Sequence, residues 1–317
     1  MNLSHRPLSL VVRRYGRGAV LCLRMVRPGF LVITAVGCGL GLACAAQAGV
    51  ALSVGKAVAT LVLALLAHAG ANVLNDHEDA RNGADAANTQ GLFPFTGGSR
   101  LVQAGVVQVQ DLRRLALWLL ALLVPGGLWL AWHSGAGLVG IGLAGIFLGW
   151  AYSAPPLALM CRGLGELSVA LAWALIVLGT DYVQRGHFAL LPLLVAFSYG
   201  LMIANILVGN AFPDAVADAQ VGKRTLAVRL GWRGAAWLYL CLALLAHGWV
   251  LGMVWVQALP MAAAWALLAA PLALAGATQL LRYGAQPQRL RPALVLGIAA
   301  AVVHGLALAA GLWSAAP

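Results

Sequence analysis

Four of the nine acidic residues in this 317-residue chain fall within ten positions. They lie in the segment "NVLNDHEDARNGADAAN" (72–88), which supplies Asp76, Glu78, Asp79 and Asp85. Asn75 and Asp79 are four residues apart, as are Asn72 and Asp76. Side chains at this spacing lie on one face of a helix. We therefore expect amide and carboxylate oxygens side by side at a helix end.

A second polar segment repeats this pattern later in the chain. It reads "NAFPDAVADAQVGKRTLAVRLG" (210–231), with Asn210, Asp214 and Asp218 spaced every four residues. Like charges at this spacing destabilise a bare helix, so we expect a cation to join the two acidic segments. A site with oxygen ligands and without Cys or His favours magnesium, whose coordination sphere is often completed by phosphate groups of the substrate.

Basic residues follow both acidic segments. Lys223 and Arg224 follow the second, and "PFTGGSR" (94–100) follows the first and ends on Arg100. Gly97 and Gly98 permit close backbone approach, and guanidinium and ammonium groups suit phosphate oxygens. The two segments together predict a diphosphate site.

The composition places this site in a membrane protein. The chain is 62% hydrophobic and 9% charged, with a mean hydropathy of +0.88, whereas soluble domains carry about 25% charged residues. Its apolar runs are continuous rather than alternating, which favours helices over a barrel. The expected fold is an all-α polytopic membrane protein with nine transmembrane helices, near 29–49, 52–75, 115–133, 135–152, 164–182, 188–210, 233–256, 258–282 and 292–314.

The net charge of +11 is explained by topology rather than by nucleic acid, which we do not expect as a partner. With the N-terminus in the cytoplasm, eighteen of the twenty Lys and Arg residues lie on the cytoplasmic side, and only Lys56 and Arg185 do not. Residues 1–28 form a basic cytoplasmic segment, in which 8–23 are either a short amphipathic helix or a disordered tail. Residues 29–317 form one domain. The expected location is the inner (cytoplasmic) cell membrane.

In this topology, eight of the nine acidic residues lie on the cytoplasmic side, and Asp181 alone does not. Acidic residues contribute little to orientation, so their gathering calls for a functional cause. Helix capping is the structural alternative for one cluster, but two clusters with the same spacing and trailing basic residues favour a site. A diphosphate site at the cytoplasmic mouth of a helical bundle suits a lipid-tailed molecule. The five cysteines are scattered and are expected to be apolar filler.

Three segments resemble the UbiA superfamily of intramembrane prenyltransferases, and the resemblance covers nearly the whole chain. They are "NDHEDARNGAD" (75–85), "YSAPPLALMCRGLGE" (152–166) and "DAVADAQVGKRTLAVRLG" (214–231). The spacing of the first motif and the "GKRTLAVRLG" tail are similar to the 1,4-dihydroxy-2-naphthoate polyprenyltransferases of menaquinone synthesis. "RPGFL" (27–31) is similar to the Arg-Pro entry to the first helix in that branch. Ala158 and Met160 stand where family members often carry basic residues.

The resemblance implies nine helices around a central cavity and magnesium-dependent prenyl transfer. One ion would be held by Asn75, Asp76, Asp79 and Asp85, and a second by Asp214 and Asp218. The diphosphate of a polyprenyl donor would bridge them, with leaving-group charge neutralised by Lys223, Arg224, Arg100 and Arg162. An electron-rich aromatic acceptor would attack the allylic cation. Tyr152 either stabilises that cation through its ring or is an interfacial tyrosine.

Three other functions are weighed against this one. The first is a UbiA-type enzyme with a different aromatic or non-quinone acceptor. The second is a CDP-alcohol phosphotransferase, which needs Gly after the second Asp of its motif, whereas Ala80 follows Asp79 here. The third is a transporter of divalent cation or phosphate, but transporters place ionisable residues near the bilayer midplane, and these carboxylates lie at span ends.

Overall fold

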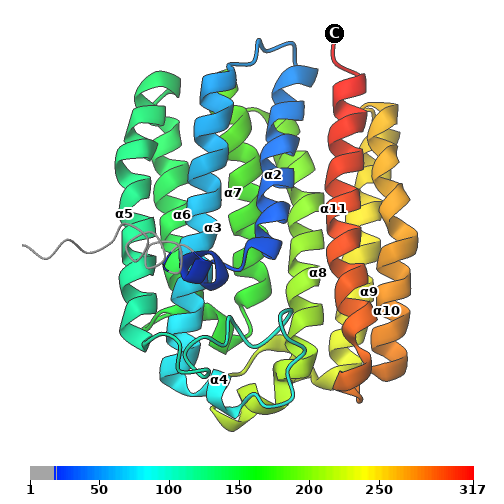
Figure 1. Cartoon of the computed structure of the whole chain (residues 1–317). Helices are drawn as coiled ribbons and strands as arrows, with labels where there is room; N and C mark the ends of the chain where they lie inside the picture. The colour runs from blue at the N-terminus through cyan, green and yellow to red at the C-terminus, as the bar shows by residue number, and fades with distance from the viewer. Residues whose placement is uncertain (1–17, 19) are drawn as a thin grey trace, which may run out of the picture.

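The computed structural model describes residue 18 and residues 20–317 of the chain. Most of the segment 8–23 therefore lies outside the described residues. Within it, residues 20–25 are helical and precede the first long helix (Figure 1). The helices that follow are α2 (Pro28–Gln47), α3 (Val54–Asn82), α4 (Ala84–Ala87), α5 (Val109–Ser134), α6 (Gly137–Ser153), η1 (Leu159–Arg162), α7 (Gly165–Arg185), α8 (Leu190–Gln220), α9 (Leu226–Trp255), η2 (Met261–Ala269), α10 (Ala270–Tyr283), η3 (Pro287–Arg289) and α11 (Arg291–Ser314).

The all-α membrane fold is confirmed, but the number of full-length spans is not. Among the described residues, eight helices are long and apolar enough to cross a membrane, with η2 and α10 together forming one of them. The remaining expected span, the fourth in chain order (135–152), corresponds to α6, which has only 17 residues. Such a helix is about 26 Å long, short of the roughly 30 Å hydrocarbon core. It ends at Ser153 because residues 155 and 156 are prolines, which force the preceding Ala154 into extended backbone.

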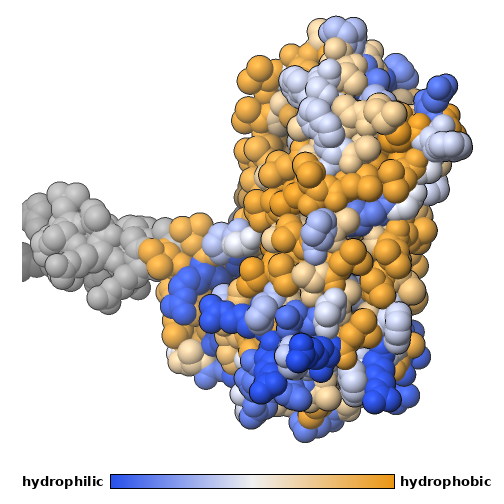
Figure 2. All heavy atoms as spheres, turned by 90° about the vertical axis from the view of Figure 1, so that its right-hand side faces the viewer, coloured by the Kyte–Doolittle hydropathy of each residue, from blue (hydrophilic) through white to orange (hydrophobic). Residues whose placement is uncertain are grey.

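Two helices continue well beyond the predicted spans, and both end at the same end of the bundle. α3 runs to Asn82 rather than residue 75, and α8 runs to Gln220 rather than residue 210. Figure 1 shows both reaching the end where α4 lies, and Figure 2 shows hydrophilic residues gathered at that end below an apolar surface. The predicted position of the two polar segments at helix ends is confirmed. Hydropathy alone predicts ends that are too early for these two helices, because their last turns carry polar residues that lie inside the bundle.

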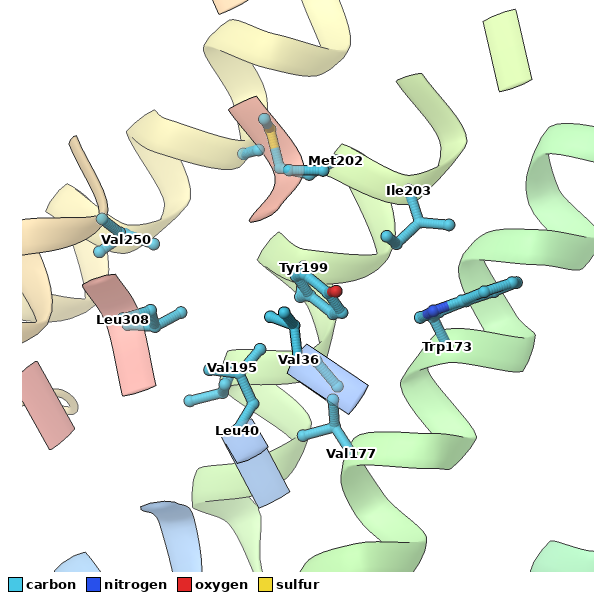
Figure 3. Close-up of a cluster of buried hydrophobic side chains, with 14 of the residues drawn as sticks. Val36, Leu40, Trp173, Val177, Val195, Tyr199, Met202, Ile203, Val250 and Leu308 are labelled. Atoms are coloured by element: carbon cyan, nitrogen blue, oxygen red, sulfur yellow. The ribbon is translucent and has the colours of Figure 1, made fainter. Parts of the chain in front are cut away.

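The apolar core lies between α2, α7, α8, α9 and α11, and it contains one buried tyrosine at its centre (Figure 3). Tyr199 has no exposed surface and its hydroxyl donates a hydrogen bond to the Ile33 carbonyl of α2, at 2.6 Å. Val36, Val177 and Val195 pack around it. This core fixes α2, α7 and α8 relative to one another.

Close helix contact in this core depends on glycines whose missing side chain another helix occupies. A Cβ atom on Gly41 of α2 would lie 2.5 Å from the Val177 carbonyl oxygen and 2.6 Å from Thr180 Cβ, both on α7. The neighbouring Gly39 is different, because a Cβ atom there would meet nothing within 4 Å. Substitutions at these two positions of one helix therefore distinguish the effect of packing from the effect of helix propensity.

We expect Gly41→Ala to lower the thermal unfolding midpoint in detergent, because the added methyl group overpacks a backbone contact at a cost of about 1–3 kcal/mol. Gly39→Ala is the matched control and is expected to be neutral or stabilising by up to about 1 kcal/mol, since Ala favours the helix. Differential scanning fluorimetry of both variants measures the difference. Equal midpoints would show that α2 and α7 do not pack as described.

Candidate active site

A cavity of about 220 Å³ opens at the polar end, between α2, α3, α4, α6, α7 and α8. It brings together seven of the predicted site residues, which come from five separate segments of the chain. They are Asn75, Asp79, Asp85, Tyr152, Asp214, Asp218 and Lys223. The two acidic motifs, more than a hundred residues apart in sequence, therefore lie at one site.

Lys223 joins the two acidic helices directly. Its ammonium donates a hydrogen bond to Asp79 Oδ1 at 2.9 Å and lies 3.2 Å from Asp218 Oδ1. The tight turn after α8 places it there, since the Lys223 N–H donates to the Asp218 carbonyl and Gly222 adopts a left-handed φ of 78°. Burial opposes the charge of Lys223, but the carboxylates of Asp79 and Asp218 outweigh it and raise its pKa above the ordinary value.

Asp214 is held by the loop that follows the first motif. Asn88 Nδ2 donates to Asp214 Oδ1 at 2.6 Å, and the Gly97 N–H donates to Oδ2 at 3.3 Å. The "TGGS" loop (96–99) therefore covers the second acidic motif as well as the first. Both its backbone, at Gly97, and the Thr96 side chain contact Asp214.

Asp76 lies beside the cavity rather than on its surface, and it is only 2% exposed. Its Oδ2 accepts a hydrogen bond from the Ser99 N–H at 2.8 Å, and its Oδ1 lies 3.8 Å from Arg27 Nη1 without a hydrogen-bond partner. A Cβ atom on Gly98 would lie 3.0 Å from Asp76 Oδ1 and 3.1 Å from Asp85 Oδ2. The two carboxylates thus flank Gly98, whose φ of 70° and missing side chain leave room for them.

Asp85 has a strongly perturbed acidity. Burial, followed by the negative charges of Asp79 and Asp76, raises the pKa of the Asp85 carboxyl to about 8. At neutral pH its carboxyl group therefore holds a proton unless further positive charge enters the site. Such a shift is typical of groups crowded at functional sites.

Asn75 and Tyr152 line the side of the cavity nearest to α6 and α7. Asn75 Nδ2 donates to Asp79 Oδ2 at 3.1 Å and contacts Met160 Sδ at 3.1 Å. Met160, at a position where the family often has a basic residue, thus helps to orient an amide of the first motif. The Tyr152 ring lies against Gly165, where a Cβ atom would be 3.5 Å from the ring edge.

The other three predicted basic residues do not line this cavity. Arg100 donates to the backbone carbonyls of Asp85 and Asn88 and lies over the Phe93 ring. Arg162 is exposed and donates to the Pro156 carbonyl at 2.6 Å. The Arg224 N–H bonds to the Cys161 carbonyl, which docks its loop on η1. In this structure these residues hold loops of the site in place.

Several residues at the site were not among the predicted ones. Arg27, Asn88 and Glu166 line the cavity, as does Asn210, which the four-residue spacing groups with Asp214 and Asp218. The sequence does indicate Arg27, because it opens the "RPGFL" segment (27–31). In the structure it precedes Pro28 at the start of α2 and adopts a left-handed φ of 55°. The role of Asn88 depends on the fold of the loop around it, so no pattern in the sequence indicates it.

The donor atoms at the site fit magnesium in type. In the described part of the chain, no three His, Cys, Asp or Glu side chains are already grouped as metal ligands. The donor chemistry nonetheless fits, because carboxylate and amide oxygens converge here and two of them, Asp76 Oδ1 and Asn210 Oδ1, are buried without a hydrogen-bond partner. The ammonium of Lys223 between Asp79 and Asp218 marks a position that attracts positive charge.

Sequence relatives extend over most of the chain. Residues 30–295 match the UbiA prenyltransferase family. The chain is 33% identical to the 1,4-dihydroxy-2-naphthoate octaprenyltransferase of Mycobacterium tuberculosis over 258 residues, covering 81% of this chain and 85% of that protein. It is 29% identical to the protein of the same name in Escherichia coli over 267 residues, covering 81% and 83%.

Solved structures share the fold. A UbiA homologue from Aeropyrum pernix in its apo form aligns with a TM-score of 0.64 at 16% identity, covering 88% of this chain and 97% of that one. A UbiA homologue from Archaeoglobus fulgidus bound to GPP and Mg2+ aligns with a TM-score of 0.56 at 17% identity, covering 91% and 99%. The predicted family and fold are confirmed: this multi-pass membrane enzyme belongs to the UbiA prenyltransferase family.

Proposed function

We propose that this enzyme transfers a polyprenyl group from a polyprenyl diphosphate to 1,4-dihydroxy-2-naphthoate, with magnesium as cofactor, as a step of menaquinone biosynthesis. The observation that carries this proposal is the meeting of acidic motifs from α3 and α8 at one cavity in an apolar bundle. The acceptor is inferred from relatives named for it at 33% and 29% identity.

Asn75, Asp76, Asp79 and Asp85 would hold one magnesium ion, and Asp214 and Asp218 a second. When bound, magnesium supplies positive charge that stabilises a leaving diphosphate. The carboxylate and amide oxygens of the site support this assignment. The raised pKa of Asp85 supports it too, because an incoming cation would displace the proton from this carboxyl group. Lys223 would then exchange carboxylate oxygens for phosphate oxygens, since its ammonium already lies on the cavity surface.

The remaining chemistry is assigned to residues around the cavity. Breaking the bond between the allylic carbon and the diphosphate oxygen leaves an allylic cation, which the ring of Tyr152, a residue of the cavity wall, would stabilise. The apolar bundle excludes water from that cation. The electron-rich carbon of the acceptor then forms the new bond to this cation. The ring becomes aromatic again by losing the group which that carbon carried, a proton or, where the carbon bears the carboxylate, carbon dioxide, and the diphosphate is released. Arg100 and Arg162 would reach the diphosphate only after leaving their present backbone carbonyls; Arg224 would join them from its loop.

The orientation follows from charge. We place the protein in the inner cell membrane with its N-terminus and its active site in the cytoplasm, because eighteen of twenty basic residues then lie on the cytoplasmic side. A water-soluble aromatic acceptor and the released diphosphate would enter and leave from that side, while a lipid-tailed donor would come from the bilayer.

The direct test is prenyl transfer in membranes that contain the protein, with octaprenyl diphosphate, magnesium and a panel of aromatic acceptors. We expect product with 1,4-dihydroxy-2-naphthoate that requires magnesium and falls by at least about 100-fold in Asp79→Asn and Asp214→Asn. Asp111→Asn is the matched control, since Asp111 lies at the start of α5 and pairs with Arg114. Product with another ring only would discard the naphthoate acceptor, and none with any ring would discard the proposal.

The raised pKa of Asp85 predicts how magnesium affinity depends on pH. Below a pKa of about 8 this carboxyl is protonated in the free protein, so binding a cation must displace the proton. We expect magnesium affinity to fall as the pH drops below 8, by up to about tenfold per unit for one displaced proton. Calorimetric titration in buffers of different ionisation enthalpy counts the released protons, and Asp85→Asn should release about one fewer.

The ion pairs of Lys223 also lead to a prediction about the free energy of unfolding. In EDTA, Lys223→Met leaves two carboxylates of a buried cluster without their counter-charge, so we expect a loss of about 3 kcal/mol in unfolding free energy. Arg114→Met removes the more exposed ion pair with Asp111 and should cost less than about 1 kcal/mol. Thermal unfolding measures both, and magnesium should restore more stability to Lys223→Met than to the unaltered protein. Equal losses for the two variants would contradict this role for Lys223.

A further inference from the structure

Glu166 is a buried acidic residue of the catalytic cavity, and the reaction described above assigns it no part. It lies in the first turn of α7, is 7% exposed and lines the cavity. Asp79 and Asp218 each pair with Lys223, whereas no side chain in the described part of the chain forms an ion pair or hydrogen bond with the Glu166 carboxylate. A buried carboxylate without a counter-charge is costly, so its place in the cavity indicates a partner that enters the site.

Helix capping alone does not account for this position. An acidic residue in the first turn of a helix is stabilised by the helix dipole, and α7 offers Glu166 that stabilisation. Asp111 has the same relation to α5, but its side chain is 42% exposed, accepts a hydrogen bond from the Gln108 N–H and pairs with Arg114. The dipole therefore favours the ionised form of Glu166, but it requires neither burial nor a place at the cavity.

Glu166 belongs to the face of α7 that lines the cavity. Val169 and Trp173 line it as well, and residues at this spacing lie on one face of a helix. Trp173 lies at the edge of the apolar core (Figure 3). The carboxylate is thus the charged end of an apolar and aromatic wall. An aromatic ring packed against Val169 and Trp173 would bring one of its hydroxyl groups to Glu166.

The start of α7 also lies beside the ring assigned to the allylic cation. The Cβ position of Gly165, the residue before Glu166, is 3.5 Å from the edge of the Tyr152 ring and 3.3 Å from Met160 Cα. Met160 Sδ contacts Asn75 Nδ2, which donates to Asp79. Asn75 and Met160 therefore lie between the acidic cluster and the start of α7, and Glu166 is close to the place where the new bond forms.

We propose that Glu166 is the base that takes the proton from a hydroxyl group of the aromatic acceptor as the new bond forms. The inference rests on the proposed function. In 1,4-dihydroxy-2-naphthoate the two hydroxyl groups flank the two ring carbons that can attack the cation, so loss of a hydroxyl proton makes the attacking carbon more electron-rich. A positioned base accelerates such a step by about 10²–10⁴-fold.

The step balances without a further reactant. The O–H bond breaks, its proton passes to Glu166, its electron pair forms a carbonyl bond, and a pair of the ring forms the carbon–carbon bond to the cation. If carbon dioxide then leaves, the pair of the broken bond restores the aromatic ring, and the oxygen regains the proton from Glu166. If a ring proton leaves instead, the oxygen regains its proton in the same way and the ring proton leaves with the diphosphate.

Glu166→Gln gives the test, because it keeps the size of the side chain and removes the base. We expect turnover with 1,4-dihydroxy-2-naphthoate to fall by at least about 100-fold, and Glu166→Asp to recover at least about tenfold of that loss. Binding of octaprenyl diphosphate with magnesium, measured by calorimetry, should stay unchanged and shows that the variants are folded. Glu78→Gln is the matched control, since Glu78 is 8% exposed at the same end of the bundle but pairs with Arg81 and does not line the cavity.

The acidity of the acceptor distinguishes a base from a residue that only shapes the wall. Fluorine on the second ring of the naphthoate makes its hydroxyl groups more acidic, so they need less help from a base. The loss of turnover in Glu166→Gln should therefore be smaller with the fluorinated acceptor, by at least about threefold. An equal loss with both acceptors overturns the proposed role.

The outcomes also separate this inference from the proposed function. Turnover of Glu166→Gln equal to that of the unaltered protein overturns the role of Glu166 and leaves prenyl transfer standing. Lost turnover together with lost donor binding overturns it too, because the carboxylate would then serve the donor site. No transfer to either acceptor by the unaltered protein removes the proposed function, and the role of Glu166 with it.

Discussion

Burial of several carboxylates at one end of an apolar bundle is the constraint on which this end of the molecule depends. Asp76 is 2% exposed, and Asp85 and Asp218 are each 5% exposed. An ionised carboxylate taken out of water costs several kcal/mol even after relaxation. The cost is offset by one ammonium, by backbone and amide donors and by protonation, through Lys223, Ser99, Gly97, Asn88 and the raised pKa of Asp85.

Those compensating groups explain the local fold. α3 and α8 extend past the apolar spans because their acidic turns find partners in Lys223 and in the loops, not in water. The "TGGS" loop needs glycines because its backbone N–H groups must reach Asp76 and Asp214, and a side chain at Gly98 would meet the carboxylates of Asp76 and Asp85. Lys223 supplies the positive charge between the carboxylates of Asp79 and Asp218.

The parts of this site that depend on local periodicity could be predicted from the sequence, and the parts that depend on loop geometry could not. The four-residue spacing of Asp214 and Asp218 identifies one helix face whatever surrounds it, and the cavity contains both. Arg100 and Arg162 were placed on the diphosphate by charge alone, yet they hold backbone carbonyls in loops. α6 (Gly137–Ser153) agrees with the expected 135–152 to within two residues, but two prolines end it and leave it shorter than a full span despite its hydropathy.

Glycine in this bundle serves two opposite purposes that sequence alone does not distinguish. At Gly41 the missing side chain brings α2 against the α7 backbone, which makes that side of the bundle dense and rigid. At Gly142 and Gly145 the missing side chain faces open space and leaves α5 and α6 apart over a cavity. The dense side joins α2 to α7, whereas the open side leaves an apolar cavity beside the polar site. The same residue type therefore closes one helix contact in this bundle and leaves another open.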